Sequence, residues 1–249
     1  MNVLQKSSTI LDLFLSDVDE LSLREISRLS GINKSTARRI ILSLIECRFL
    51  KQTKKRGKYS LGMKFLDFTQ TVKKHNPILD IAEPYLTKLS EYTDETISLA
   101  LWDGRSAVIC LSIHPTHPLS VISYEGTLLD LHHNSLGKAL LAELPDEYVK
   151  YYCNRKLSSY TPNTITTLED LQQNLKIVKQ EGVAIDNEEG FLGIRGIASM
   201  LKGNGGNLVG AITILGPTIR LTQEKLEIYI PMVKEYAARI SKDLGYVGS

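Results

Sequence analysis

The feature that most constrains this chain is a run of helix and turn signals between residues 21 and 61. Ser22 and Glu25 have the spacing of a capping box, which indicates a short helix that begins there. Gly31 interrupts the apolar pattern, and glycine readily adopts the left-handed conformation in which many helices end. Asn33 is a suitable N-cap for a second helix. We therefore expect two short helices joined by a tight turn.

The second of these helices should run to about Arg48 and have two different faces. Its apolar face, at three- and four-residue spacing, consists of Ala37, Ile40, Ile41, Leu44 and Ile45. Its polar N-terminal half contains Lys34, Ser35, Thr36, Arg38 and Arg39. In a helix-turn-helix, the second helix places its N-terminal residues in the DNA major groove, where arginine can pair with guanine through two hydrogen bonds. We expect Arg38 and Arg39 to read bases, and the three polar residues at the helix start to bind phosphates at the positive end of the helix dipole.

A basic hairpin follows the second helix. Residues 49–53 and 58–61 alternate as strands do, and Gly57 in the turn between them suits a tight hairpin. The cationic residues of this hairpin are Lys54, Lys55, Arg56 and Lys58. We expect its tip to bind the phosphate backbone or the minor groove of DNA, so that residues 1–61 form a winged helix-turn-helix. Taken singly, the arginine pair also suits an ordinary exposed helix face, and the hairpin suits a charged edge that discourages strand pairing.

Charge is distributed unevenly along the chain. Residues 1–76 contain 15 Lys and Arg against 7 Asp and Glu, a net charge of +8, whereas residues 77–249 contain 15 against 21, a net charge of −6. A basic domain joined to an acidic one indicates that phosphate binding is confined to the first domain. A basic solvated surface is the other interpretation of the charge alone.

Composition bounds the remaining possibilities. Two domains fit a chain of 249 residues of which 43% are hydrophobic. Cys47, Cys110 and Cys153 are far apart and have no CxxC spacing, so they indicate reduced thiols rather than disulfides or a zinc site. No apolar run approaches the roughly 18 residues that span a bilayer, and the first 16 residues lack the apolar core of a signal peptide. We expect a cytoplasmic protein with no membrane association and no cofactor.

Residues 62–76 are expected to form a helix that links two domains. Its apolar stripe consists of Leu61, Phe65, Phe68 and Val72, widened by Met63 and Leu66. Such a stripe needs a partner, and a second copy of the chain fits best because readers of the major groove commonly present two helices to a two-fold operator. Packing against its own first domain is the alternative.

Residues 77–249 have the pattern of an α+β domain with an antiparallel sheet. Helices are expected at residues 78–91, 135–144, 145–153 and 168–181, and from an N-cap at Thr222 toward Gly245, with Pro231 as a kink or boundary. Strands are expected at residues 96–102, 107–113, 119–124, 183–186, 194–201 and 208–215. Asp103-Gly104 should form the turn between the first two strands.

The chain resembles the IclR family of bacterial transcriptional regulators over nearly its whole length. The resemblance is carried by SLREISRLSGINKSTARRIILSLIECRFL and KYSLGMKFL in the first domain, and by LHHNSLGKALLAEL, TITTLEDLQQNLKIVKQEGVAIDNEEGFLGIRGIAS and AITILGP in the second. It implies a winged helix-turn-helix at residues 1–61, a linker and dimerisation helix at 62–76, and a GAF-like effector-binding domain at 77–249. It also implies that the chain binds operator DNA as a homodimer or a homotetramer.

The same resemblance implies where a small-molecule effector binds. Carried over residue by residue, it selects Ser135, Leu136, Asp186, Gly196, Thr213 and Leu215. Gly196 and Leu215 replace a cysteine and a serine of the family's glyoxylate and pyruvate binders, so we expect a less polar pocket for an organic acid, sugar acid or aromatic compound with an apolar part. Without the resemblance, the same residues suit a helix N-cap, a surface-turn carboxylate and a sheet hydroxyl.

The sequence also suits two functions other than ligand-responsive transcriptional regulation, and it contains one candidate metal site. Asp186, Glu188 and Glu189 suit the acid and base of a hydrolase, although a solvated loop explains them more simply, and we expect no catalytic residues. A DNA-binding oligomer without an effector is the second alternative. A metal site at Cys110, His114 and His117 is not expected, because a proline-bounded loop holds the two histidines.

Overall fold

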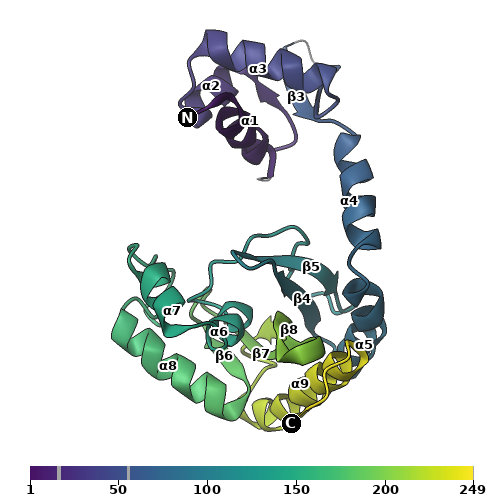
Figure 1. Cartoon of the computed structure of the whole chain (residues 1–249), viewed down its shortest axis with the longest axis vertical. Coiled ribbons are helices and arrows are strands. Elements are labelled where there is room, and N and C mark those ends of the chain that lie inside the picture. Colours follow the sequence, from purple (N-terminus) through teal and green to yellow (C-terminus); the bar gives the residue numbers. More distant parts are fainter. Residues whose placement is uncertain (16–17, 55–56, 249) are drawn as a thin grey trace. The chain divides into compact units, whose positions relative to one another are not determined.

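The computed structural model describes residues 1–15, 18–54 and 57–248. The chain divides into two compact units, Met1–Asn76 and Pro77–Ser249, and each is described by itself (Figure 1).

The N-terminal unit consists of short helices and a small antiparallel sheet (Figure 1). Its helices are α1 (Val3–Asp12), the 3-10 turn η1 (Leu13–Leu15), α2 (Leu23–Ser30), α3 (Lys34–Glu46) and α4 (Lys64–Lys74). Its strands are β1 (Leu21–Ser22), β2 (Leu50–Gln52) and β3 (Lys58–Leu61), in the order β1-β3-β2. The predicted hairpin is present, and β1 adds a third strand that the sequence did not indicate, with Leu21 opposite Tyr59.

The signals predicted around the turn between α2 and α3 are confirmed. Ser22 and Glu25 form both hydrogen bonds of the capping box. Gly31 follows α2 with φ 68°, and the Asn33 side chain accepts a hydrogen bond from the Thr36 backbone N–H. Helix α3 ends two residues earlier than expected, because the chain turns at Arg48, which has φ 65°.

Helix α4 buries none of its own residues completely. Its first turns contact the rest of the N-terminal unit, since the rings of Phe65 and Phe68 lie 5.4 and 5.9 Å from the ring of Phe49. Leu66 and Val72 stay more than half exposed. The alternative interpretation of the linker stripe therefore holds for its aromatic residues and for Leu61, which also packs against the core of this unit, whereas Leu66 and Val72 remain largely uncovered by the described residues.

The C-terminal unit is built on one five-stranded antiparallel sheet with the order β5-β4-β8-β7-β6 (Figure 1). The strands are β4 (Thr96–Trp102), β5 (Ala107–Ile113), β6 (Ala184–Asn187), β7 (Ile194–Lys202) and β8 (Leu208–Pro217). The helices are α5 (Ile78–Thr93), α6 (Ser135–Leu141), α7 (Asp146–Cys153), α8 (Leu168–Glu181) and α9 (Gln223–Asp243). The 3-10 turn η2 (Asn204–Gly206) closes the hairpin between β7 and β8.

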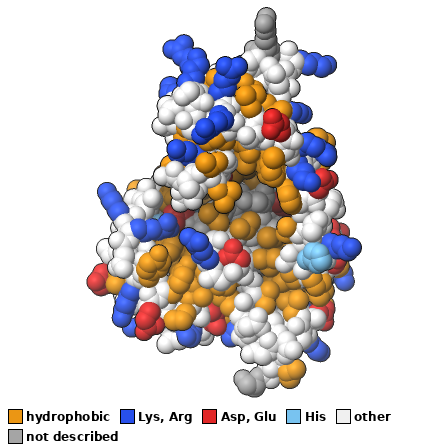
Figure 2. All heavy atoms as spheres, turned by 45° about the horizontal axis from the view of Figure 1, so that its top comes forward, with side chains coloured by type: hydrophobic (Ala, Val, Ile, Leu, Met, Phe, Trp, Pro, Cys, Tyr) orange, Lys and Arg blue, Asp and Glu red, His pale blue; other side chains and the backbone are white. Residues whose placement is uncertain are grey.

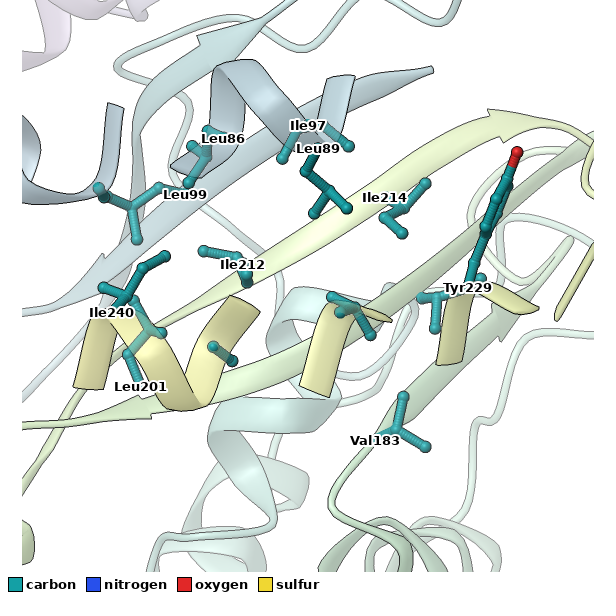
Figure 3. Close-up of a cluster of buried hydrophobic side chains, with 14 of the residues drawn as sticks. Leu86, Leu89, Ile97, Leu99, Val183, Leu201, Ile212, Ile214, Tyr229 and Ile240 are labelled. Carbon is teal, nitrogen blue, oxygen red and sulfur yellow. The ribbon is translucent and has the colours of Figure 1, made fainter. Parts of the chain in front are cut away.

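The two faces of this sheet carry side chains of different size. Large aliphatic residues such as Ile97, Ile197 and Ile214 point toward α5 and α9 and form one core (Figure 3). Alanines and hydroxyl residues alternate with them and point toward α6, where a second core continues under α7 and α8. Small side chains allow α6 to lie close to the sheet, and every residue of α6 is buried.

Several predicted elements of this unit need correction. Residues 119–124 form no strand, because the free edge of β5 bonds instead to the segment just after them: the Ile109 N–H donates to the Thr127 carbonyl, and the Leu129 N–H to the Ala107 carbonyl. Helix α6 ends three residues early, at Leu141. Pro231 lies inside α9 without ending it. Thr222 is the N-cap residue of α9, as predicted, but its hydroxyl donates to Glu224 instead of accepting from a backbone N–H of the helix.

Candidate DNA-binding surface and effector site

Helix α3 separates its residues into a buried and an exposed face. Ala37, Ile40, Ile41 and Leu44 are buried in the core of the N-terminal unit. Lys34, Ser35, Arg38 and Arg39 are exposed, and Thr36 is half-buried. Neither arginine forms an ion pair with any residue that the structure describes. The N-terminal half of α3 therefore presents two uncompensated guanidinium groups to solvent.

The wing supplies further positive charge on the same unit. Lys54 is exposed two residues after the end of β2, and Lys58 is half-buried at the start of β3. Gly57 has φ 80°, as the tight turn requires. Lys55 and Arg56, which we also expect to bind DNA, lie outside the described residues. Figure 2 shows Lys and Arg side chains gathered over this part of the molecule.

An apolar groove of about 790 Å³ runs between α1, α3 and the start of α4. Exposed aliphatic side chains from α1 and η1 line one wall, and Phe49 and Phe65 line another. Thr36 and Arg39 also border the groove, whereas Arg38 does not. Arg39 thus lies between the exposed face of α3 and this groove.

The structure brings the predicted effector residues together on the α6 side of the large sheet. Asp186 lies opposite Gly196, and Gly196 opposite Leu215, in adjacent strands. The Ser135 hydroxyl lies 2.9 Å from the Thr213 hydroxyl. A Cβ at Gly196 would lie only 2.6 Å from the Ser135 oxygen, so glycine is what allows α6 to come this close. The side chain of the sixth residue, Leu136, belongs to the apolar core beside them.

Asp186 is buried, so the surface-turn and solvated-loop interpretations of this carboxylate are wrong. Its Oδ1 accepts a hydrogen bond of 2.8 Å from the Glu189 backbone N–H. Burial raises the pKa of Asp186 to about 6, an effect that this hydrogen bond partly offsets and the nearby Glu189 charge reinforces. Glu188 is only half-buried, and its side chain accepts from the Gly193 N–H instead of joining Asp186.

Sequence reasoning missed the buried ion pair that Lys138 and Glu189 form next to Asp186. Lys138, one turn after Ser135, is completely buried, and its Nζ donates to Glu189 Oε1 at 2.5 Å and to the Ile185 carbonyl at 2.6 Å. Glu189 is 6% exposed. The available signal was a single lysine in the apolar segment SLGKALL, where a charged side chain needs a buried partner.

A row of hydroxyl groups, also missed, continues across the same face of the sheet. Ser98 pairs in register with Thr213 on one side and Ser112 on the other. The Ser98 and Ser112 hydroxyls lie 3.0 Å apart, and Ser112 donates to Ser123 at 3.3 Å. The signal for this row was that its hydroxyl residues alternate with the large aliphatic residues, one position out of phase with them. The α6 side of the sheet therefore combines buried hydroxyls, two carboxylates and one ammonium.

His132 and the segment after α7 hold the chain that leads into α6. The buried His132 ring contacts the Tyr152 hydroxyl at 3.0 Å and the Ser158 carbonyl at 2.9 Å. In the described ranges, no group of three or more His, Cys, Asp or Glu residues is placed to bind a metal ion. No helix in these ranges is long and apolar enough to span a bilayer.

Two family models match these two units. Residues 3–54 match the IclR helix-turn-helix domain, and residues 70–242 match the model described as bacterial transcriptional regulator IclR C-terminal. The chain belongs to the IclR family. It is therefore a transcriptional regulator with an N-terminal helix-turn-helix, and the resemblance and fold class inferred from the sequence are confirmed.

Individual IclR-family proteins match over almost their whole length. The HTH-type transcriptional regulator KipR of Bacillus subtilis is 30% identical over 242 residues, which cover 97% of this chain and 96% of KipR. The crystal structure of Thermotoga maritima IclR is 32% identical and has a TM-score of 0.76, covering 99% of this chain and 100% of that one. An IclR homologue from Microbacterium hydrocarbonoxydans, complexed with 4-hydroxybenzoate, has the same fold at 21% identity, with a TM-score of 0.84 and coverage of 98% and 99%.

Proposed function

We propose that this regulator binds an operator through α3 and the wing of at least two copies, and that a small organic metabolite in the C-terminal unit changes its affinity for that operator. The observation that carries the DNA-binding part is the exposed N-terminal half of α3 with its two uncompensated arginines. The guanidinium group of arginine can donate two hydrogen bonds to a guanine in the major groove, and hydroxyl groups and helix N-termini bind phosphates.

The proposed reading surface divides its work between helix and wing. Arg38 and Arg39 read base edges, while Lys34, Ser35 and Thr36 fix the position of the helix against the backbone. Lys54 and Lys58, together with Lys55 and Arg56, bind phosphates. These wing contacts contribute affinity that falls with salt but carries no sequence information.

Dimerisation is supported by apolar surface that the N-terminal unit leaves uncovered. Leu66 and Val72 of α4 are exposed, and so are Leu4 and Leu15 beside the apolar groove. Patches of this kind mark protein interfaces. A two-fold assembly would present two α3 helices to the two halves of an operator.

Effector binding is supported by the cluster of Ser135, Asp186, Gly196 and Thr213. It joins buried polar side chains from α6, β6 and β8 beside Gly196 of β7, and a few convergent polar groups in an apolar setting are typical of small-molecule sites. The homologue from Microbacterium hydrocarbonoxydans holds 4-hydroxybenzoate, an aromatic acid within the class that we expect here. The ligand changes DNA affinity only if it binds two arrangements of the protein unequally.

Selection of genomic fragments from the source organism tests this function. Wild-type protein should enrich a small set of fragments that share a two-fold motif, and an Arg38→Ala/Arg39→Ala variant should enrich none of them. Thermal-shift screening of organic acids, sugar acids and aromatic acids then tests the effector, since a ligand at about 100 times its Kd adds roughly 2.7 kcal/mol to the stability of the domain that binds it. Enrichment without any thermal shift would favour a DNA-binding oligomer without an effector.

A further inference from the structure

The buried ion pair between Lys138 and Glu189 leaves hydrogen-bonding capacity unused. Lys138 has three N–H donors, of which the Ile185 carbonyl and Glu189 Oε1 accept two. Glu189 Oε2 is buried and has no hydrogen-bond partner in the described ranges. An unpartnered carboxylate oxygen at this depth is costly, so the site lacks one group that both donates and accepts.

This pair adjoins the proposed effector site. Lys138 follows Ser135 by one turn of α6, and its ammonium binds the carbonyl of Ile185, the neighbour of Asp186. The backbone of Glu189 donates to the Asp186 carboxylate. The charged pair and Asp186 therefore belong to one set of hydrogen bonds, which lies one turn of α6 from Ser135.

The charges of the cluster decide what it can accept. Lys138 brings one positive charge, whereas Glu189 and an ionised Asp186 bring two negative charges, with no other described cation bonded to them. Burying a further carboxylate beside these two acids would be unfavourable. A hydroxyl group meets both demands without charge, because it donates to Glu189 Oε2 and accepts from the third N–H of Lys138.

We propose that the Lys138–Glu189 pair is the inner end of the effector site and binds a hydroxyl group of the effector. The effector is then a hydroxylated compound, such as a phenolic or hydroxy acid, whose hydroxyl lies deepest and whose carboxylate stays farther from the two acids. This inference rests on the proposed effector function and narrows it to one class of ligand.

Binding of matched ligand pairs tests the inference. Wild-type protein is titrated by calorimetry with 4-hydroxybenzoate and benzoate, with lactate and propionate, and with gluconate and hexanoate. The hydroxylated member should bind at least tenfold more tightly in one pair or more. Equal binding within every pair, as expected if an ordered water fills the position, or no binding by any of them, overturns the inference.

Two variants assign the preference to this pair of residues. Lys138→Met/Glu189→Leu removes both charges of the pair together, so neither residue is left as an unpaired buried charge and the domain should still fold. The preference should fall below twofold. Lys202→Met/Glu143→Leu is the matched control, because it removes another ion pair of the same unit, 3.2 Å long and six residues along β7 from Gly196. It should keep the wild-type preference.

A further variant keeps the inference testable if Lys138→Met/Glu189→Leu does not fold. Glu189→Gln keeps the shape of the side chain and should reduce the hydroxyl preference at least threefold while the melting transition stays cooperative. An unchanged preference in a folded variant overturns the inference. Enrichment of operator fragments is measured on the same proteins. Loss of this enrichment would count against the proposed function. Intact enrichment with an unchanged ligand preference would count only against the proposal that Lys138 and Glu189 bind a hydroxyl group of the effector.

Discussion

Arg38 and Arg39 are neighbours in sequence but differ in their surroundings on α3. Both are exposed, yet Arg39 borders the apolar groove beside α1 and Arg38 does not. A partner seated in that groove would contact Arg39, so loss of Arg39 would disturb both DNA reading and assembly. Arg38 is therefore the cleaner probe of base recognition.

Substitution of Arg38 should change specificity more than general affinity. Arg38→Ala is expected to reduce discrimination at one operator base pair by about 1 to 3 kcal/mol, whereas Lys54→Ala should weaken operator and random DNA alike and lower the salt slope by about one. Fluorescence anisotropy on the two DNAs at several salt concentrations measures both effects. Lys156→Ala, at an exposed lysine of the other unit, is the control. An equal loss of affinity for operator and random DNA in both variants would contradict the assignment of base recognition to Arg38 and phosphate binding to Lys54.

Asp186 should make the stability of the C-terminal unit depend on pH. Its folded pKa of about 6 lies above its usual value, so the carboxyl favours folding when protonated, and this contribution is lost as the pH rises from about 4 through 6. Asp186→Asn should therefore raise stability at pH 8 by about 1 to 3 kcal/mol and change little at pH 4. Urea unfolding at the two pH values measures the difference. A stability change that is the same at both pH values would contradict the burial argument.

Individual residues differed in how far the sequence could assign them. The caps at Ser22 and Asn33 depend on neighbours three residues away, so local spacing was enough. The effector positions came from the family resemblance rather than from physical reasoning. Lys138 and Glu189 are 51 residues apart, and nothing in local sequence reports a contact that the fold creates.

At the scale of elements, the close contact between α6 and β7 depends on the absence of a side chain at Gly196. Gly196→Ala would place a Cβ 2.6 Å from the Ser135 oxygen and 3.3 Å from a Leu215 methyl group. Overpacking of this kind typically costs about 1 to 3 kcal/mol. Adding Ser135→Ala removes the nearest atom and should recover at least half of the loss, as measured by chemical unfolding of the single and double variants. Purely additive losses would show that the two residues do not limit each other.

The missing strand at residues 119–124 shows what pattern alone cannot decide. Leu119, Ile122 and Tyr124 are of residue types that favour strands, yet all three side chains are exposed. A strand forms only where a neighbouring edge is free, and the edge of β5 is used by the backbone around Thr127 and Leu129. Apart from β1, the described strands were predicted to within one or two residues, because each has two partners or a buried face.

At the scale of the whole molecule, assembly should depend on the uncovered part of α4. Leu66→Glu/Val72→Glu is expected to raise the dissociation constant of the dimer at least tenfold, because both apolar side chains are more than half exposed on α4. Analytical ultracentrifugation of the full chain measures this. Thr69→Glu, at an exposed polar position of the same helix, should have little effect. An unchanged dissociation constant in the double variant would place the interface elsewhere.

The division into a basic and an acidic unit was visible in the sequence and matches two separate tasks. The net charge of +8 in residues 1–76 favours DNA, whereas the net charge of −6 in residues 77–249 keeps the second unit from competing for phosphates. The identity of the ligand could not be predicted, because the buried polar groups that would recognise it come from α6, from β6 and the residues after it, and from β8, which are distant in sequence.

The central claim is that ligand binding in the C-terminal unit changes operator binding by the N-terminal unit, and one titration tests it directly. Operator affinity is measured by anisotropy with and without a saturating ligand found by thermal shift, for the wild-type protein and for Asp186→Ala. The account predicts at least a fivefold change in Kd for the wild type, less than twofold for Asp186→Ala, and equal affinity of both proteins without ligand. A wild-type Kd that stays the same when the ligand site is saturated would contradict it.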